Sequence, residues 1–268
     1  MPDPERTPEV LVAVAHGSKD PRAAACVDEL MSLVRSRLDA TTLGAMTELR
    51  TAYLGHAAPS LPQVLGSIGR DRRVTVLPLL LTAAYHSKTD LPRLLARSSR
   101  SFVYGDTLGP HPLLLRALSR RMADTGVRDR SRTGVVLAAA GSSDPEANAT
   151  ISGLAAQWQA ASGWHSVLPA YACPPATGTT ATGTTATGTT VTGTTVAEAV
   201  GALSRGGARQ VVVATYLLAP GFFTDRIRRE ALAAGAVAVS AALGAAPEVA
   251  DVILDRYATA TPAIRAAA

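Results

Sequence analysis

One segment of this sequence occurs twice, and the repeat constrains the fold more than any other feature. An apolar run leads into His-Gly-Ser-Lys-Asp-Pro at 16–21, and a second apolar run leads into Ala-Gly-Ser-Ser-Asp-Pro at 140–145. The glycine, one serine, the aspartate and the proline recur in register. Further along, the segment 210–223 parallels 73–86, with another apolar run before a loop. Two halves of the same design are therefore expected.

Within each half, apolar strand-like runs alternate with amphipathic helical segments. In the first half we expect strands at 10–15, 47–53, 73–81 and 101–104, and helices at 22–38, 59–68, 92–96 and 112–122. The same order restarts with a strand at 133–139. Because alternating strands and helices are typical of βαβ units, the sequence predicts an α/β protein with two duplicated lobes, each a parallel sheet flanked by helices.

The expected domain boundaries follow this repeat. Residues 1–123 form the first lobe, the polar stretch 124–132 is a linker rich in Asp and Arg, and residues 133–268 form the second lobe. Within the second lobe, 177–195 contains repeated Thr-Gly-Thr-Thr. Regular glycine and little apolar bulk favour a flexible surface loop there, with a threonine-rich β-hairpin as the alternative.

Composition narrows the class of protein. With 268 residues of which 47% are hydrophobic, the chain can bury one large core or two modest ones. The first ten residues lack the pattern of a secretory leader, and no apolar run approaches about 18 residues, so we expect a cytoplasmic protein without a membrane partner. Cys26 and Cys173 have neither the number nor the spacing of a disulfide framework or a thiolate zinc site.

The net charge of +5 comes almost wholly from arginine, because Lys19 and Lys88 are the only lysines. Arginine is a good bidentate partner for carboxylate and phosphate groups, so an acidic ligand is compatible with this composition. The arginines are scattered and are not interleaved with aromatic residues. This pattern argues against nucleic-acid binding.

Two histidines stand where an open α/β sheet binds ligands. His16 follows the strand at 10–15, and Gly17 allows a sharp turn before a helix start at Asp-Pro. His86 follows a second apolar strand and two small residues. Ligands bind beyond the carboxyl ends of parallel strands, and two imidazoles there could share a metal ion. The alternative for His16 is a residue that only caps the turn.

The second half lacks both imidazoles. Ala140 takes the place of His16, and the alignment of the repeat sets Phe223 against His86. The chemistry is therefore expected in the first half. His56 follows the expected strand at 47–53 and could face the same site, whereas His111 and His165 are interpreted as a surface turn residue and a structural residue.

Taken together, the motifs resemble the class II chelatases of the CbiX and SirB type, which insert iron or cobalt into sirohydrochlorin. The resemblance rests on 16–21, on Val-Leu-Pro-Leu-Leu-Leu-Thr-Ala-Ala-Tyr-His-Ser-Lys-Thr-Asp-Leu-Pro at 76–92, and on Tyr-Gly-Asp-Thr-Leu-Gly-Pro at 104–110. It extends through most of the chain. It implies a two-lobe chelatase-like fold with metal and macrocycle in an interlobe cleft, and His16 and His86 as catalytic residues and metal ligands.

The chain departs from the family pattern at one place. Members often carry a glutamate in a Phe-Leu-Glu-Leu segment that ends the second strand, whereas this chain has Ala-Tyr-Leu-Gly-His at 52–56. His56 could replace the carboxylate as a ligand or proton acceptor, although alternation along a strand predicts that it points the other way. The missing carboxylate bears on metal preference and rate.

These features lead to an expected activity, sirohydrochlorin ferrochelatase, which inserts Fe²⁺ to make sirohaem. The alternatives are a cobaltochelatase of cobalamin synthesis and, in a different class, a non-catalytic carrier of metal or tetrapyrrole. Imidazole binds Fe²⁺ and Co²⁺ and accepts protons near neutral pH. No nucleotide-binding GxxxxGK[ST] loop is present, in keeping with insertion without ATP.

The expected ligands are a divalent metal ion, as a substrate rather than a permanent cofactor, and sirohydrochlorin, a polycarboxylate. We expect no permanently bound cofactor. Five residues are candidates for contacts with the macrocycle carboxylates: Ser18, Lys19, Lys88, Ser142 and Ser143. Helix capping or a solvated rim is an equally good interpretation of each. Because two lobes already pair within one chain, a monomer is expected.

Overall fold

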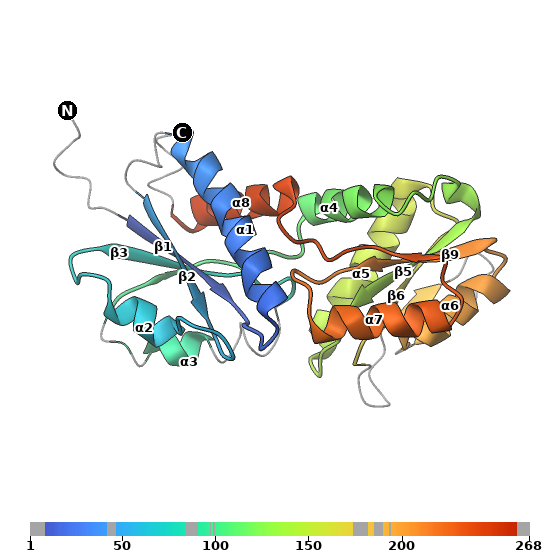
Figure 1. The fold of residues 1–268 in the computed structure, drawn as a ribbon, viewed down its shortest axis with the longest axis horizontal. Coiled ribbons are helices and arrows are strands. Elements are labelled where there is room, and N and C mark those ends of the chain that lie inside the picture. Colours follow the sequence, from blue (N-terminus) through green and yellow to red (C-terminus); the bar gives the residue numbers. More distant parts are fainter. Residues whose placement is uncertain are drawn as a thin grey trace. The chain divides into compact units, whose positions relative to one another are not determined.

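The computed structural model describes residues 9–41, 47–83, 91–96, 98, 100–173, 182–184, 190–192 and 194–261. The chain forms two compact units, Met1–His111 with Ala245–Ala268, and Pro112–Gly244. Each unit contains a four-stranded parallel sheet flanked by helices (Figure 1). The predicted α/β fold with two parallel sheets is therefore confirmed.

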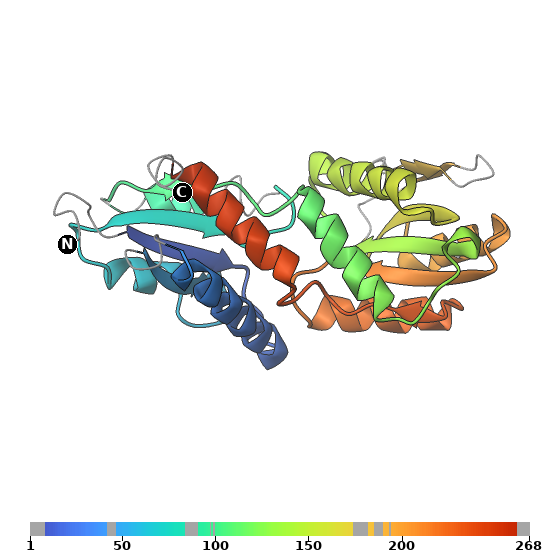
Figure 2. The same ribbon diagram turned by 90° about the horizontal axis from the view of Figure 1, so that it is seen from above.

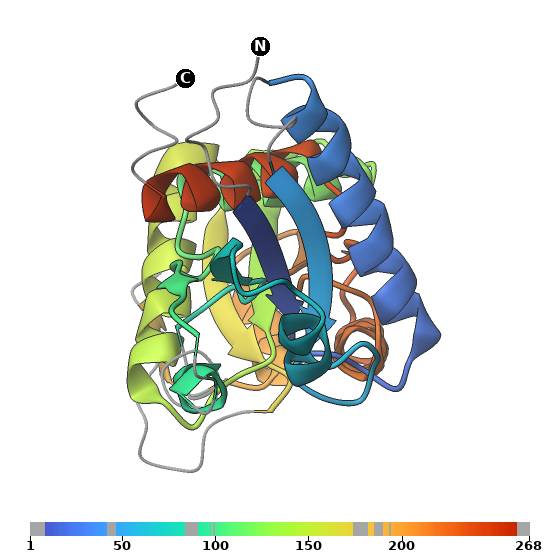
Figure 3. The same cartoon turned by 90° about the vertical axis from the view of Figure 1, so that its left-hand side faces the viewer.

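The first unit is built around β1, a central strand that is buried along its whole length. Its sheet has the order β2-β1-β3-β4. Helices α2 and α3 cover one face, and α1 and α8 lie on the other (Figure 3). The elements are β1 (Glu9–Ala15), α1 (Pro21–Asp39), β2 (Thr47–Tyr53), α2 (Leu61–Gly66), β3 (Arg73–Pro78), α3 (Leu91–Ala96), β4 (Val103–Tyr104) and α8 (Pro247–Ala260).

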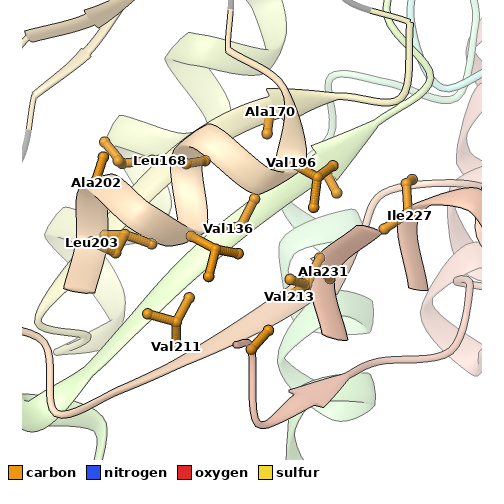
Figure 4. Close-up of a cluster of buried hydrophobic side chains, with 14 of the residues drawn as sticks. Val136, Leu168, Ala170, Val196, Ala202, Leu203, Val211, Val213, Ile227 and Ala231 are labelled. Carbon is orange, nitrogen blue, oxygen red and sulfur yellow. The ribbon is translucent and has the colours of Figure 1, made fainter. Parts of the chain in front are cut away.

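The second unit repeats this plan around β5, with the order β10-β9-β5-β6. Helices α6 and α7 close one face of its sheet over a core that includes Val136, Leu203 and Ile227 (Figure 4). The elements are α4 (Pro112–Ala123), a 3-10 helix (Arg130–Arg132), β5 (Thr133–Ala139), α5 (Pro145–Ser162), β6 (Ser166–Tyr171), α6 (Val196–Arg205), β9 (Gln210–Thr215), α7 (Phe222–Ala233) and β10 (Ala238–Val239).

Two helices are exchanged relative to their order in the chain. Helix α4 follows β4 of the first unit but packs in the second unit, where the side chain of Trp158 donates to Ser119 at 3.2 Å. Helix α8 follows β10 but packs on α1 and β3 (Figure 2). The division predicted at 1–123 and 133–268 differs from this grouping, because a repeat in sequence does not reveal which sheet a helix covers.

Polar contacts fix α8 in the first unit. The Tyr257 hydroxyl donates to the Glu9 carboxylate at 2.9 Å and lies 3.2 Å from the Thr47 hydroxyl. All three groups are buried. Arg37 of α1 forms an ion pair with Asp251 of α8. Burial of the phenol raises the pKa of Tyr257, so this hydroxyl stays protonated and can donate over the neutral range.

The threonine-rich tract contains a short hairpin. Strands β7 (Thr182–Thr184) and β8 (Thr190–Thr192) pair in antiparallel fashion. The prediction of a flexible loop is therefore wrong for these residues, and the hairpin alternative holds. β-branched threonine favours extended backbone, and here that preference outweighs the glycines.

None of the helices among the described residues is both long and apolar enough to cross a membrane.

Candidate metal-binding site

The first exposed side chain after β1 is that of His16. Every residue of β1 is buried, and β1 lies between β2 and β3. The carboxyl end of a central parallel strand lies at the middle of one edge of the sheet, and α/β proteins bind ligands beyond that edge. The sequence thus places the imidazole of His16 at the carboxyl end of the central strand, where a ligand site is expected.

The backbone after His16 makes a turn that only glycine fits well. Gly17 has φ +87°, and a Cβ built there would lie 1.7 Å from the carbonyl oxygen of Gly55. The amide of Gly55 in turn donates to the His16 carbonyl at 3.1 Å, and that of Leu54 to Ala15 at 3.0 Å. The turn is therefore pressed against the segment that follows β2, which fixes the backbone of His16.

The remainder of the turn caps α1. The Ser18 hydroxyl accepts from the amide of Asp20 at 3.0 Å, and the Asp20 carboxylate accepts from the amide of Arg22 at 3.0 Å. The Arg22 guanidinium also hydrogen bonds to this carboxylate, which lowers the pKa of Asp20. These bonds confirm that Asp-Pro starts the helix, and they give Ser18 a capping role.

The His16 imidazole has a defined hydrogen bond on one nitrogen. Its Nδ1 lies 3.0 Å from the carbonyl oxygen of Gly17. Because a carbonyl oxygen only accepts, we assign the Nδ1–H tautomer, which places the lone pair on Nε2. A neutral imidazole held in this way can bind a divalent metal or take up a proton through Nε2.

The second predicted ligand, His86, lies outside the described residues, as does Lys88. The described chain reaches Ala83. After β3 the amide of Leu79 donates to Val14 at 2.8 Å, and Leu80 accepts from Leu108 at 2.9 Å. The chain therefore leaves the sheet beside the end of β1. The pairing of His16 with His86 stays a prediction.

His56 is exposed and lies three residues beyond the end of β2. It has φ +61°, a left-handed conformation that is uncommon for a residue with a side chain. The sequence argument assumed that His56 continues the strand, so that alternation would point its side chain away from the site. That assumption is wrong, because His56 lies in a turn beyond the end of the strand. Its neighbour Gly55 is hydrogen bonded to His16, so the structure brings these two backbone segments together.

The second unit repeats the turn without the imidazole. Gly141 has φ +88°, and a Cβ there would lie 2.1 Å from the carbonyl oxygen of Cys173. The Ser142 hydroxyl accepts from the amide of Asp144 at 3.0 Å. Ala140 is in the position that His16 has in the first unit, and Ser143, like Lys19, is exposed. The turn is thus a scaffold common to both units, and one of the two has an imidazole on it.

Sequence reasoning missed the side chain that braces the second turn. The side-chain oxygen Oδ1 of Asn148 accepts from the backbone amide of Ser142 at 3.1 Å, and its side-chain nitrogen Nδ2 donates to the carbonyl oxygen of Ser142 at 2.7 Å. Asn148 is buried on α5, and the available signal was a polar residue on the buried face of the helix. Among the described residues, no group of three or more His, Cys, Asp or Glu lies close enough to hold a metal.

Comparison with known proteins identifies the family. The CbiX family model matches residues 10–125 and 178–260, which is most of the chain. The chain belongs to the CbiX family. It is 28% identical over 148 residues to the sirohydrochlorin cobaltochelatase of Priestia megaterium, over 52% of this chain and 46% of that protein. It is 27% identical over 194 residues to the sirohydrochlorin ferrochelatase of Bacillus subtilis (strain 168), over 68% and 67% of the two chains.

The fold of this CbiX-family chain also matches a solved structure. SirB from Bacillus subtilis with Fe³⁺ aligns with a TM-score of 0.71 and 22% identity, over 96% of this chain and 97% of the other. The likeness establishes the chelatase-like fold. The aligned region spans less than half the length of the cobaltochelatase, and the two curated relatives are named for different metals.

Proposed function

We propose that this CbiX-family protein inserts a divalent metal ion into sirohydrochlorin, and that Fe²⁺ is the metal. The observation that carries the proposal is an exposed imidazole, His16, on a rigid turn at the carboxyl end of the central strand β1. The family match and the names of the two curated relatives support the same reaction. Co²⁺ is the alternative metal, because imidazole binds both ions.

Each residue has a defined task in the proposed reaction. Nε2 of His16, together with His86, holds the metal ion while it loses water. When the ion passes to the macrocycle, the lone pair on each imidazole is released and can accept one of the two protons that leave the pyrrole nitrogens. Two protein ligands hold a divalent ion weakly, so the ion can pass to the macrocycle. Lys19 is exposed three residues after His16 and supplies a positive charge for a macrocycle carboxylate.

The test is metallation of anaerobic sirohydrochlorin, followed by absorbance with Fe²⁺ or Co²⁺ in separate reactions. We expect His16→Ala and His86→Ala each to lower the catalysed rate by about 100-fold, the size of a lost acid–base or ligand group. His165→Ala is the matched control, because His165 contacts the carbonyl of Gly206 in the second unit. It should change the rate by less than about twofold.

The outcomes separate the candidate functions. A faster reaction with Fe²⁺ supports the ferrochelatase, and a faster reaction with Co²⁺ supports a cobaltochelatase. Binding of sirohydrochlorin without acceleration by either metal would overturn the enzyme in favour of a carrier. That result would fit the absence of a carboxylate at 52–56. His56→Ala tests whether this imidazole replaces it, and a change in the ratio of the Fe²⁺ and Co²⁺ rates is the expected sign.

A further inference from the structure

The segment Tyr-Gly-Asp-Thr-Leu-Gly-Pro at 104–110 supports the family resemblance but has no task in the proposed reaction. It forms the loop that follows β4. An arginine of α8 contacts this loop within the first unit. The Arg256 guanidinium donates to the carbonyl oxygen of Pro110 at 3.0 Å and to that of Leu108 at 3.4 Å. A helix from the end of the chain therefore holds the loop after β4 in place.

The second unit contains the same contact with the helices exchanged. Leu-Gly at 108–109 recurs as Leu-Gly at 243–244. An arginine follows each leucine by 13 residues: Arg121 in α4 and Arg256 in α8. The Arg121 guanidinium donates to the Leu243 carbonyl oxygen at 2.8 and 3.1 Å. Each arginine thus binds the Leu-Gly segment that precedes the other helix, because α4 and α8 change units.

In the first unit, α8 makes one more polar contact at this loop. Nε2 of His111 lies 3.5 Å from a carboxylate oxygen of Asp255 on α8. By the same spacing, the corresponding residues of the second unit are Ala246 and Arg120. They cannot form this contact, because alanine has no polar side-chain group. The additional contact therefore occurs in the unit that has His16.

The loop held by α8 borders the exit of β3. The amide of Leu108 donates to the Leu80 carbonyl at 2.9 Å, and the amide of Leu79 donates to Val14 of β1 at 2.8 Å. A series of hydrogen bonds thus runs from Arg256 through Leu108 to the segment that leaves the sheet beside the end of β1. This is the end of the sheet at which His16 lies.

We propose that Arg256 is a positioning residue for the metal site of the first unit. This inference rests on the proposed function and adds a residue of α8 to it. The Arg256 guanidinium fixes the loop at 104–110, and the loop fixes the exit of β3, from which the sequence continues to the predicted ligand His86. His16 is fixed separately, by hydrogen bonds to the segment after β2. Loss of the guanidinium should therefore weaken metal binding more than binding of the macrocycle.

The experiment compares Arg256→Met with Arg121→Met in the full-length protein. Each variant keeps an aliphatic side chain and loses a guanidinium that binds backbone carbonyls, so both should lower the midpoint of thermal unfolding by about 2–4 °C. Metallation of anaerobic sirohydrochlorin with the faster of Fe²⁺ and Co²⁺ gives kcat and both KM values. For Arg256→Met we expect the KM for the metal ion to rise about tenfold, because groups that orient metal ligands contribute this much to affinity. The KM for sirohydrochlorin should stay within about twofold, as should both KM values of Arg121→Met.

Two further measurements separate positioning from a loss of stability. Arg256→Lys keeps a donor for one of the two carbonyls and should return the KM for the metal ion to within about threefold of wild type. The Kd for Co²⁺ alone, titrated by absorbance without the macrocycle, should rise about tenfold in Arg256→Met. In the His86→Ala background, Arg256→Met should change this Kd by less than about twofold, because the positioned ligand is gone.

The outcomes distinguish this inference from the proposed function. Wild-type protein that does not metallate sirohydrochlorin overturns the proposed function, and the titration of Co²⁺ alone then decides the role of Arg256. Equal constants for the metal ion in Arg256→Met and Arg121→Met overturn that role. A joint rise of both KM values in Arg256→Met, or an effect on the Co²⁺ Kd that persists in the His86→Ala background, also overturns it. If Arg256→Met does not fold, Arg256→Lys and Arg121→Lys are compared, and equal constants again overturn it.

Discussion

The two units share a turn and differ in what stands on it. Gly17 and Gly141 have nearly the same φ, +87° and +88°, and each approaches the backbone that follows a neighbouring strand. In both turns a serine hydroxyl accepts from the amide of the capping aspartate at 3.0 Å. The side chain before the glycine is His16 in one unit and Ala140 in the other. The turn is thus a structural feature of both units, whereas the imidazole that can bind a metal or a proton stands on the turn of the first unit.

The turns also differ in how they are braced. Asn148 bridges the amide and carbonyl of Ser142 in the second unit. The corresponding position of the first unit in the repeat is Ala24, whose methyl group cannot hydrogen bond. The brace that Asn148 gives the second turn therefore has no counterpart at position 24, and the first turn is held by backbone hydrogen bonds from Leu54 and Gly55.

The largest effect is expected from adding a methyl group to either glycine. Gly17→Ala and Gly141→Ala force left-handed backbone on alanine and drive its Cβ into a carbonyl oxygen. Each should lower the free energy of unfolding by about 4 kcal/mol. Chemical denaturation measures this loss. Where both variants are folded, Gly17→Ala should lose metallation activity because His16 moves. Gly141→Ala should retain more than about half of the wild-type metallation rate. Equal loss of activity would contradict the division of roles.

An intermediate effect is expected in the cores under the exchanged helices. Ile253→Ala in α8 and Leu118→Ala in α4 each remove a fully buried side chain. Each should cost about 3 kcal/mol. Hydrogen exchange should show faster exchange in β1, β2 and β3 for Ile253→Ala, and in β5, β6 and β9 for Leu118→Ala. The reverse pattern would mean that the helices belong to the halves in which the sequence places them.

The smallest effect is expected from the paired serines. Ser18→Ala and Ser142→Ala each remove one hydrogen bond to the capping aspartate. Each should cost about 1 kcal/mol, measured by thermal or chemical unfolding. If Ser18 only caps the helix, the KM for sirohydrochlorin is the same in both variants. A rise in KM confined to Ser18→Ala would show that its hydroxyl also contacts the macrocycle.

Many of the elements were predictable because the signals are local. The strand expected at 133–139 is β5 as observed, and the helix expected at 22–38 differs from α1 by one residue at each end. Asp20 and Asp144 both cap helices as the Asp-Pro pairs predict. The strand expected at 73–81 ends early at Pro78. The exposed position of His16 follows from a buried strand, a glycine and a helix start.

The sequence by itself determined that this protein has two parallel-sheet units, that the candidate ligands His16 and His86 both fall in the first of them, and that the turn at Gly17 must be tight. These follow from periodicity, from a repeat and from the conformational range of glycine. Only the tertiary structure decided that α4 and α8 change units, that His56 lies in a turn, and that Asn148 braces Ser142. Such facts depend on contacts between residues far apart in the chain, which no local pattern encodes.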